Sequence, residues 1–305
     1  MSIHHLESAP STSNPVRLSP VASMEVIGSS AGSPQQSGAA SGYLLRAAGL
    51  TILVDCGPGV VSALAASGRI GDLDAVIVSH EHFDHSGDLM ALAYHRAFPV
   101  RRRPLPLYAP SSLRRTLDRF DELFGIPTLD DLKAPLRTQL PIVDVAIGSS
   151  FTIGDLRVDT LAASHPVPTM SMRFPQLGLV YTADTALTPE LIRFSQGCTL
   201  LAEATYVTAH GRDFSAHGHM SGIEAGRLAV EADSPLLVLT HFADPRESAE
   251  TLAHSAEHFA GPLTRATPGM MIPLDARARA ERAAASVPVG WRPQTGGAVD
   301  PRTIS

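Results

Sequence analysis

Short apolar runs alternate with amphipathic segments over most of the chain. The run DAVIVS (74–79) is almost continuously apolar, which is typical of a strand that is buried on both faces. Apolar residues with helical spacing predict helices between the strands. The predicted strands are 24–28, 42–47, 50–56, 74–79, 105–109, 151–153, 156–163, 170–174, 177–184, 199–204 and 235–241, with one or two more in 263–274. The predicted helices are 60–67, 87–96, 111–124, 188–195, 221–232 and 246–259.

Strands and helices do not alternate one for one along the chain. Some strands follow one another directly, whereas a helix separates others. This mixture favours an α/β protein with two sheets flanked by helices over one doubly wound parallel sheet. We expect one domain over residues 23–275, preceded by a flexible Ser/Pro-rich tail (1–22). Residues 276–305 predict a second tail, partly helical and then loose.

The composition narrows the class of protein. Hydrophobic residues make up 44% of the chain and charged residues 18%, which is enough for a sizeable core. The net charge of −6 counts against nucleic acid as a ligand but not against a nucleotide. Two cysteines cannot form a disulfide framework, and no apolar run approaches the roughly 20 residues of a membrane helix. We therefore expect a cytoplasmic protein without a membrane segment.

The strongest chemical signal is the motif HEHFDH, which begins at His80 directly after the buried strand. Residues two apart in an extended chain point the same way, so His80 and His82 can reach one metal ion. Asp84 and His85 follow as the chain turns and can face a second ion. Imidazole and carboxylate groups are suitable ligands for Zn²⁺. A chance cluster on a surface loop is the alternative, but it leaves the regular spacing unexplained.

Three further candidate ligands, His165, Asp184 and His241, each follow or end a predicted strand. Functional residues often lie where a strand passes into a loop. Each one alone is as readily explained by a structural role. Together with the motif they predict a site for two metal ions with seven ligands: His80, His82, Asp84, His85, His165, Asp184 and His241.

These motifs resemble those of the metallo-β-lactamase superfamily, and in particular those of its ribonuclease Z branch. Two more segments extend the likeness: AEATY (202–206) resembles the HEAT segment of that branch, and HMS (219–221) resembles its HST segment. The resemblance covers roughly residues 24–274 and implies a four-layer αββα sandwich. The other matching segments are HEHFDH (80–85), His165, YTADT (181–185) and LTHF (239–242).

The resemblance also implies how the ligands divide between two divalent ions, zinc or alternatively manganese. Asp184 would bridge both ions, and a homodimer would be a common arrangement. The first ion would take His80, His82 and His165, and the second Asp84, His85 and His241.

The sequence departs from the ribonuclease Z pattern in three places. Ala183 stands where a glycine is usual, and Ala202 stands where HEAT has its histidine. Only 18 residues separate His165 from Asp184, an interval in which ribonuclease Z carries its tRNA-gripping arm. This compact form is similar to a group of actinobacterial proteins described as atypical cyclic-nucleotide phosphodiesterases. The segments HPVPTMSMRF and HMSGIEAGRLA carry the closest likeness.

The implied mechanism uses a hydroxide that bridges the two metal ions. With Asp84 and Asp184 as ligands, the site keeps one positive charge, which favours a small anionic substrate. A sugar alkoxide is a poor leaving group, so His219 could act as its general acid with Glu203 orienting the imidazole. The alternative is that His219 caps or packs at the start of helix 221–232, with Ser221 as N-cap. We thus place Asp84, His219 and Glu203 among the catalytic residues.

The leading hypothesis is therefore a di-metal phosphodiesterase that acts on a cyclic nucleotide such as cAMP. One alternative is a hydrolase of a carboxylic ester, lactone or thioester, because fold alone does not settle the substrate. A tRNA 3′-end endonuclease is a third hypothesis, against which the short interval and the acidic balance argue. A non-enzymatic metal- or nucleotide-binding protein is a fourth, against which the intact ligand set argues.

Several other residues carry weaker signals. Asp55 ends a predicted strand and is interpreted as a brace for the ligands rather than a ligand. The GPG segment (57–59) predicts a turn, with phosphate binding as the alternative. The basic run 101–103 predicts a solvated loop, again with phosphate contact as the alternative. His210 and His217 flank the segment that contains His219 and are candidates to line the pocket.

Overall fold

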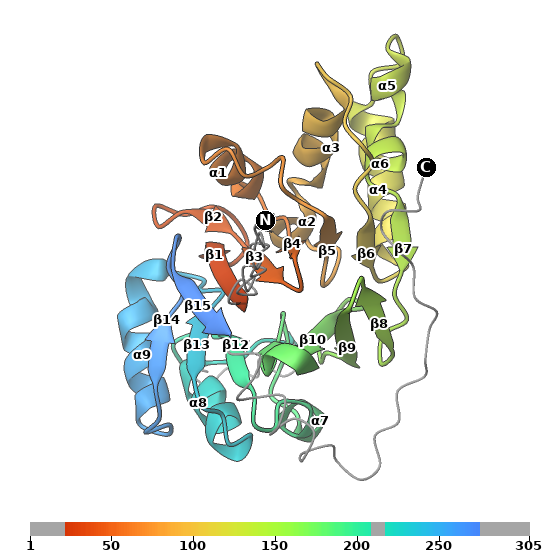
Figure 1. Ribbon diagram of the computed structural model, residues 1–305. Coiled ribbons are helices and arrows are strands. Elements are labelled where there is room, and N and C mark those ends of the chain that lie inside the picture. Colours follow the sequence, from red (N-terminus) through yellow and green to blue (C-terminus); the bar gives the residue numbers. More distant parts are fainter. Residues whose placement is uncertain (1–21, 209–216, 275–305) are drawn as a thin grey trace, which may run out of the picture.

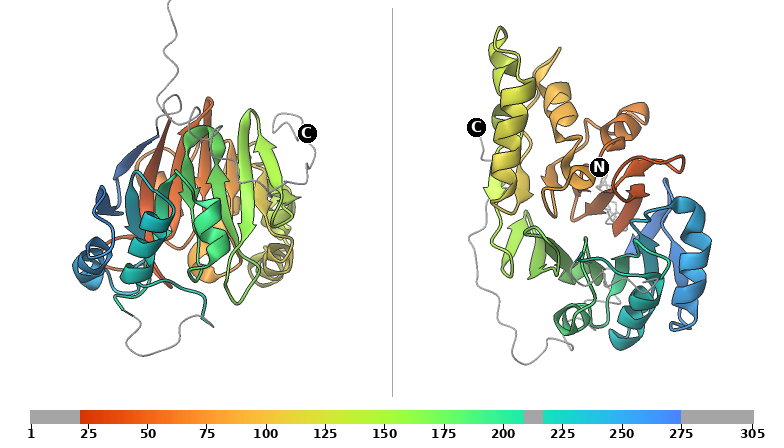
Figure 2. Two further views of the ribbon diagram at one scale, coloured as in Figure 1. Left: turned by 90° about the horizontal axis from the view of Figure 1, so that it is seen from below. Right: turned by 180° about the vertical axis from the view of Figure 1, so that it is seen from behind.

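The computed structural model describes residues 22–208 and 217–274 as two β-sheets packed face to face, with helices on both outer faces (Figure 1). The rear view in Figure 2 shows the same layers, with α8 and α9 on one side of the sheets and α1 and α3 on the other. This arrangement confirms the predicted four-layer αββα sandwich. The outer helices are α1 (Val60–Ala66), α2 (Phe83–Ser86), α3 (Leu89–Ala97), α4 (Leu113–Phe124), α5 (Asp130–Lys133), α6 (Pro135–Gln139), α7 (Pro189–Phe194), α8 (Gly222–Glu231) and α9 (Ser248–Ala256).

The first sheet has the strand order β15-β1-β3-β4-β5-β6-β7, with β2 paired to β1. The strands from β4 to β7 run parallel to one another, and β1, β3 and β15 pair antiparallel. The bounds of these strands are β1 (Ala22–Ser30), β2 (Ala39–Ala40), β3 (Gly42–Ala47), β4 (Leu50–Val54), β5 (Ala75–Ile77), β6 (Leu107–Ala109), β7 (Ile142–Asp144) and β15 (Met271–Leu274).

The second sheet has the order β14-β13-β12-β11-β10-β9-β8. The strands from β11 to β14 are parallel, and the hairpin-connected strands β8 to β10 complete the sheet. Their bounds are β8 (Ser150–Ile153), β9 (Leu156–Ala162), β10 (Met170–Phe174), β11 (Leu179–Tyr181), β12 (Thr199–Glu203), β13 (Leu237–Thr240) and β14 (Leu263–Arg265).

Three apolar layers hold the sandwich together. The central layer lies between the sheets and includes Tyr43 of β3 and Tyr181 of β11, whose ring centroids are 5.0 Å apart. A second layer joins the first sheet to α1, α3 and α4. A third joins the second sheet to α7, α8 and the end of α9. Each strand near the centre of a sheet is thus buried on both faces, which explains its continuous apolar sequence.

The topology gathers the candidate residues at one edge of the molecule. The loops that follow β4, β5 and β9, and those that follow β11, β12 and β13, begin at the carboxyl ends of their strands. Functional residues in α/β sheets gather at such ends. The predicted metal ligands lie in these loops or, for Asp84 and His85, in α2, which follows β5, and Glu203 is the last residue of β12.

The differences from the predicted elements concern short segments. β11 is shorter than the predicted strand 177–184, because a 3₁₀ turn (η1, Pro175–Leu177) precedes it and residues 182–184 turn into the site. β2 and α2 are too short to produce a periodic pattern. The predicted tails lie outside the described residues except for Ala22, with which β1 begins. Across the described ranges, no helix has both the length and the apolar character that a membrane crossing requires.

Candidate metal centre

The HEHFDH motif follows β5, and its first half is extended whereas its second half is helical. The chain is extended up to His82, which has φ −60° and ψ 149° and serves as the N-cap residue of α2. The single turn of α2 then carries Asp84 and His85. Because the extended part and the helical turn project their side chains differently, the pair His80 and His82 and the pair Asp84 and His85 face two adjacent positions, as the sequence predicted.

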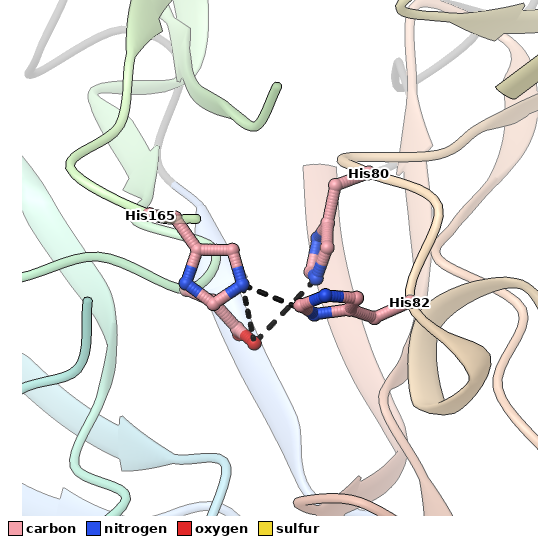
Figure 3. Close-up of side chains that lie close together, drawn as sticks. His80, His82 and His165 are labelled. Carbon is pink, nitrogen blue, oxygen red and sulfur yellow. Dashed lines mark hydrogen bonds and ion pairs between the residues drawn. The ribbon is translucent and has the colours of Figure 1, made fainter. Parts of the chain in front are cut away.

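The first group of side chains contains His80, His82, His165 and Asp184, whose ligand atoms all lie within 4.8 Å of one another. His165 Nε2 is 3.1 Å from His82 Nδ1. The distance from His80 Nε2 to Asp184 Oδ2 is 3.6 Å, and that from His165 Nε2 is 4.0 Å. Figure 3 shows the three imidazoles converging, with His165 approaching from the side opposite to His80 and His82.

The second group contains Asp84, His85, Asp184 and His241, again within 4.8 Å. His241 Nε2 is 3.1 Å from Asp84 Oδ2 and 3.4 Å from Asp184 Oδ1. His85 Nε2 is 3.2 Å from the same Asp184 oxygen. Asp184 thus directs one carboxylate oxygen to each group. The structure brings together all seven side chains that the sequence singled out.

These groups fit divalent cations. His80 Nε2 and Asp184 Oδ1 are buried and have no hydrogen-bond partner in the described part of the chain, a costly arrangement unless an ion satisfies them. The Nε2 atoms of His85 and His241 are only 3.2 Å apart. Five imidazoles and two carboxylates form a donor set that zinc and similar ions prefer. The residues present therefore match the requirements of a two-ion centre.

The protonation of the histidines depends on burial and on the nearby carboxylates. Burial lowers the pKa of His80, His82 and His165, which favours the neutral form that binds metal. Burial also disfavours the charged ring of His85, but Asp184 and Asp55 outweigh it and hold its pKa well above the ordinary value. A cation that binds beside His85 would therefore displace a proton.

Asp55 braces the ligands from behind, as the sequence indicated. It follows β4, is fully buried and has φ 60°. Its Oδ2 accepts hydrogen bonds from His85 Nδ1 (2.8 Å) and the Tyr181 hydroxyl (2.7 Å). Its Oδ1 accepts the Ser79 backbone N–H (2.7 Å). These bonds orient the His85 ring so that Nε2 faces the centre.

The substitution Asp55→Asn should weaken metal binding by about 10- to 100-fold, because an amide has only one acceptor oxygen and cannot accept at both carboxylate positions, from His85 and Tyr181 at one and from the Ser79 N–H at the other. The measurement is the chelator concentration that removes half of the bound metal. Asp72→Asn, on an exposed loop, is the matched control. Equal metal retention in the two variants would show that Asp55 is only a structural residue.

Gly218 links the loop of His165 to that of His219. His165 Nδ1 donates to the Gly218 carbonyl (3.0 Å), so Nε2 is the nitrogen that can bind a metal ion. Gly218 has φ +71°, and a Cβ there would lie 2.7 Å from the Cα of His165. Only glycine fits both the conformation and the approach. No pattern in the sequence indicated this contact.

His219 is held by Glu203, a buried residue at the end of β12. Glu203 Oε1 accepts from His219 Nδ1 (3.0 Å), and Oε2 accepts from the Thr205 hydroxyl (2.7 Å) and the Met220 N–H (3.1 Å). Burial lowers the pKa of His219, but the charge and hydrogen bond of Glu203 outweigh it and raise the pKa to about 8. The imidazole is therefore largely protonated at neutral pH.

The start of α8 contains the N-cap that the sequence indicated. Ser221 is the N-cap, accepting from the Glu224 N–H, and the Glu224 carboxylate accepts from the Ser221 N–H (2.8 Å) in return. His219 thus does not cap the helix. Thr205, which the sequence did not single out, joins Glu203 to the candidate ligand His241, since its hydroxyl oxygen is 2.8 Å from His241 Nδ1.

A cavity of about 330 Å³ opens over both groups. It is lined by ligands of both groups, by His219 and His217, and by Thr205 and Tyr206. His210 lies outside the described residues. The basic run 101–103 does not line the cavity, and Arg101 pairs with Asp131 on the surface (2.6 Å). This finding agrees with the solvated-loop interpretation.

The GPG segment has a structural role. A Cβ at Gly57 would lie 1.9 Å from the carbonyl oxygen of Asp84, so only glycine lets the two loops meet. Gly59 adopts φ +91° as the N-cap residue of α1. The segment does not line the cavity over the metal ligands, which supports the turn interpretation.

Comparison with known proteins agrees with this geometry. Residues 51–242 match the family described as beta-lactamase superfamily domain. The probable metallo-hydrolase YhfI of Bacillus subtilis (strain 168) is 31% identical over 222 residues, covering 71% of this chain and 85% of the relative. The crystal structure of YhfI from Bacillus subtilis matches with a TM-score of 0.70 and 29% identity, covering 82% of this chain and 99% of that one.

Ribonuclease Z is also among the relatives. The ribonuclease Z of Nocardia farcinica (strain IFM 10152) is 25% identical over 304 residues, covering 83% of this chain and 97% of the relative. The similarity covers 85% of YhfI and 97% of this ribonuclease Z, and the family match over residues 51–242 spans all seven side chains. This chain therefore belongs to the metallo-β-lactamase superfamily of metallo-hydrolases, in the branch that includes ribonuclease Z.

Proposed function

We propose that this protein is a phosphodiesterase that hydrolyses a cyclic nucleotide such as cAMP. The observation that carries the proposal is the position of His219. Its imidazole is anchored by Glu203 and lines the same cavity as the two groups of metal ligands. A proton donor opposite a metal centre is what cleavage of a phosphate–sugar bond requires, because the sugar alkoxide leaves poorly without a proton.

Two divalent ions, zinc or manganese, would complete the site. The first would be held by His80, His82 and His165 and the second by Asp84, His85 and His241, with Asp184 shared. Bound there, the ions would supply positive charge for an anionic phosphate and acidify a water near neutral pH. The remaining tasks fall to side chains of the chain itself.

The carboxylates and His219 have separate tasks in this proposal. Burial raises the pKa of Asp84, but its hydrogen bond with His241 and the nearby histidines hold it well below the usual range. Asp84 is therefore an anionic ligand and not a proton donor. Its Oδ2 also accepts the Gly32 N–H (2.6 Å), which fixes its orientation. Glu203 keeps His219 protonated. Within residues 22–208 and 217–274, no hydrogen bond engages His219 Nε2, which can therefore deliver a proton to the leaving oxygen.

The test is hydrolysis of cAMP and of bis(p-nitrophenyl) phosphate by purified protein with added Zn²⁺ or Mn²⁺. We expect turnover of both substrates, with kcat/KM falling by at least about 100-fold after chelation and returning when metal is restored. Absence of turnover on both substrates would reject the proposal.

A hydrolase of carboxylic esters, lactones or thioesters is the second candidate. The metal ligands alone suit that reaction as well, since a tetrahedral oxyanion needs the same positive charge. Its leaving groups need less protonation, so His219 would then matter little. Cleavage of precursor tRNA has less support, because β10, η1 and β11 occupy the interval from His165 to Asp184 and leave no room for an RNA-gripping arm.

A further inference from the structure

A second hollow adjoins the cavity over the metal ligands. It has a volume of about 610 Å³ and is lined by Gln35, Gln36 and Ser37 on one side and by residues 243–246 on the other. Ala243 lines both spaces. A ligand can therefore reach from the metal centre past Ala243 into the second hollow.

The turn that forms one wall is fixed to the metal centre. Gln35 and Gly38 exchange two backbone hydrogen bonds of 2.9 Å, which close a tight turn with Gln36 and Ser37 at its tip. Just before the turn, the Gly32 N–H donates to Asp84 Oδ2 (2.6 Å) and the Ala31 N–H donates to the Phe242 carbonyl (3.0 Å). These bonds hold the start of the turn against Asp84 and the loop after β13.

The opposite wall is anchored in the same way. The Ala243 N–H donates to the carbonyl of Thr205 (3.1 Å), and the Phe242 N–H donates to the carbonyl of Ser29 (3.1 Å). This wall therefore continues the loop that carries His241, whereas the turn with Gln35 and Gln36 lies between β1 and β2.

The residues that line the hollow can form hydrogen bonds, and together they carry no net charge. Arg246 and Asp244 neutralise each other through contacts of 3.0 Å (Nε to Oδ1) and 2.5 Å (Nη2 to Oδ2). The side chains of Gln35 and Gln36 are exposed, and within residues 22–208 and 217–274 neither amide takes part in a hydrogen bond. Each amide has two donor hydrogens and an acceptor oxygen. Such a surface suits a neutral, planar, hydrogen-bonding group better than a second phosphate.

The size of the first cavity leads to the same conclusion. Sites for drug-sized ligands span about 300–1,000 Å³, so the cavity of about 330 Å³ is at the lower end. A phosphate placed against the metal ligands and a sugar beside His219 would fill most of it. We infer that the base of a nucleotide substrate lies in the hollow between the Gln35–Ser37 turn and residues 244–246, an inference that rests on the proposed function.

The test compares ligands with and without a base in the double variant Gln35→Ala/Gln36→Ala. We expect its KM for cAMP to rise about tenfold with kcat within about twofold, as for the loss of two ordinary hydrogen bonds in ground state and transition state alike. Calorimetry should show 5′-AMP bound about tenfold more weakly while the affinity for inorganic phosphate is unchanged. Gln176→Ala is the matched control, because Gln176 lies at the far end of β10 and bonds to the Asp155 carbonyl.

Two results would overturn the inference. Equal weakening of 5′-AMP and phosphate would mean that the turn only supports Asp84, and unchanged 5′-AMP affinity would mean that the base lies elsewhere. The binding experiment is independent of turnover. If wild-type protein hydrolyses neither phosphodiester but the variant still loses 5′-AMP affinity selectively, the proposed function fails and the base site stands.

Discussion

Replacing Asp184 with alanine should abolish hydrolysis, with kcat/KM falling by at least about 1,000-fold and metal content falling well below that of the wild type. Asp184 is the one carboxylate that belongs to both groups, with Oδ2 facing His80 and Oδ1 facing His85 and His241. Its loss would remove a ligand from each ion and leave the surrounding imidazoles without their shared negative charge. Elemental analysis and steady-state kinetics measure the two effects.

The control for this substitution is Asp155→Ala, which removes an exposed carboxylate at the turn between β8 and β9. It should leave metal content and kcat/KM unchanged. Asp184→Asn should have a metal content and a kcat/KM between those of Asp184→Ala and Asp155→Ala, since an amide oxygen still offers one ligand atom. Metal content equal to the wild type in Asp184→Ala, with activity within about tenfold, would contradict the shared-ligand role.

Replacing His219 with alanine should lower kcat for cAMP by about 100- to 1,000-fold but lower that for bis(p-nitrophenyl) phosphate by less than about tenfold. The difference arises because p-nitrophenolate leaves without a proton, whereas a sugar alkoxide needs one. Glu203→Gln should also lower kcat for cAMP, but by a smaller factor, because Nδ1 of His219 loses its charged partner. Parallel assays of both substrates measure the selectivity.

His217→Ala is the matched control for His219. His217 lines the same cavity, and its ring centroid is 5.4 Å from that of His219. We expect its loss to change kcat for both substrates to a similar, small extent. If His219→Ala slowed both substrates equally, the ring would serve binding or structure, and if it slowed neither, the hydrolase of esters or lactones would be the better hypothesis.

The convergence of the seven candidate ligands was predictable from the sequence because the fold places them by a simple rule. Continuous apolar strands are easy to recognise, and the loops at their carboxyl ends meet at one edge. His165, Asp184 and His241 therefore came together with the HEHFDH motif although they are far apart along the chain. Asp55 also ends a predicted strand, and its position beside His85 was expected for the same reason.

Other features needed the structure because no periodic pattern marks them. The contacts of Thr205 with Glu203 and His241 depend on how two strand ends meet. The turn with Gln35 and Gln36 is short and polar, so its sequence indicated only a loop. The capping box of Ser221 and Glu224 shows that His219 does not cap α8, and the acid role of His219 stays a prediction.

One departure from the family pattern also has a structural explanation. Ala183, which stands where glycine is usual, adopts φ 50°, a conformation that costs a non-glycine residue roughly 1–2 kcal/mol. The fold keeps this conformation because it turns the chain from β11 so that Asp184 faces both groups. The mild substitution therefore leaves the carboxylate in place.

Anomalous diffraction at the zinc absorption edge, from crystals of the protein grown with Zn²⁺, tests the central claim most directly. The account predicts two peaks. One should lie among His80, His82 and His165 and the other among Asp84, His85 and His241, with Asp184 contacting both. Diffraction without a peak at these side chains, or with zinc bound only elsewhere, would contradict it.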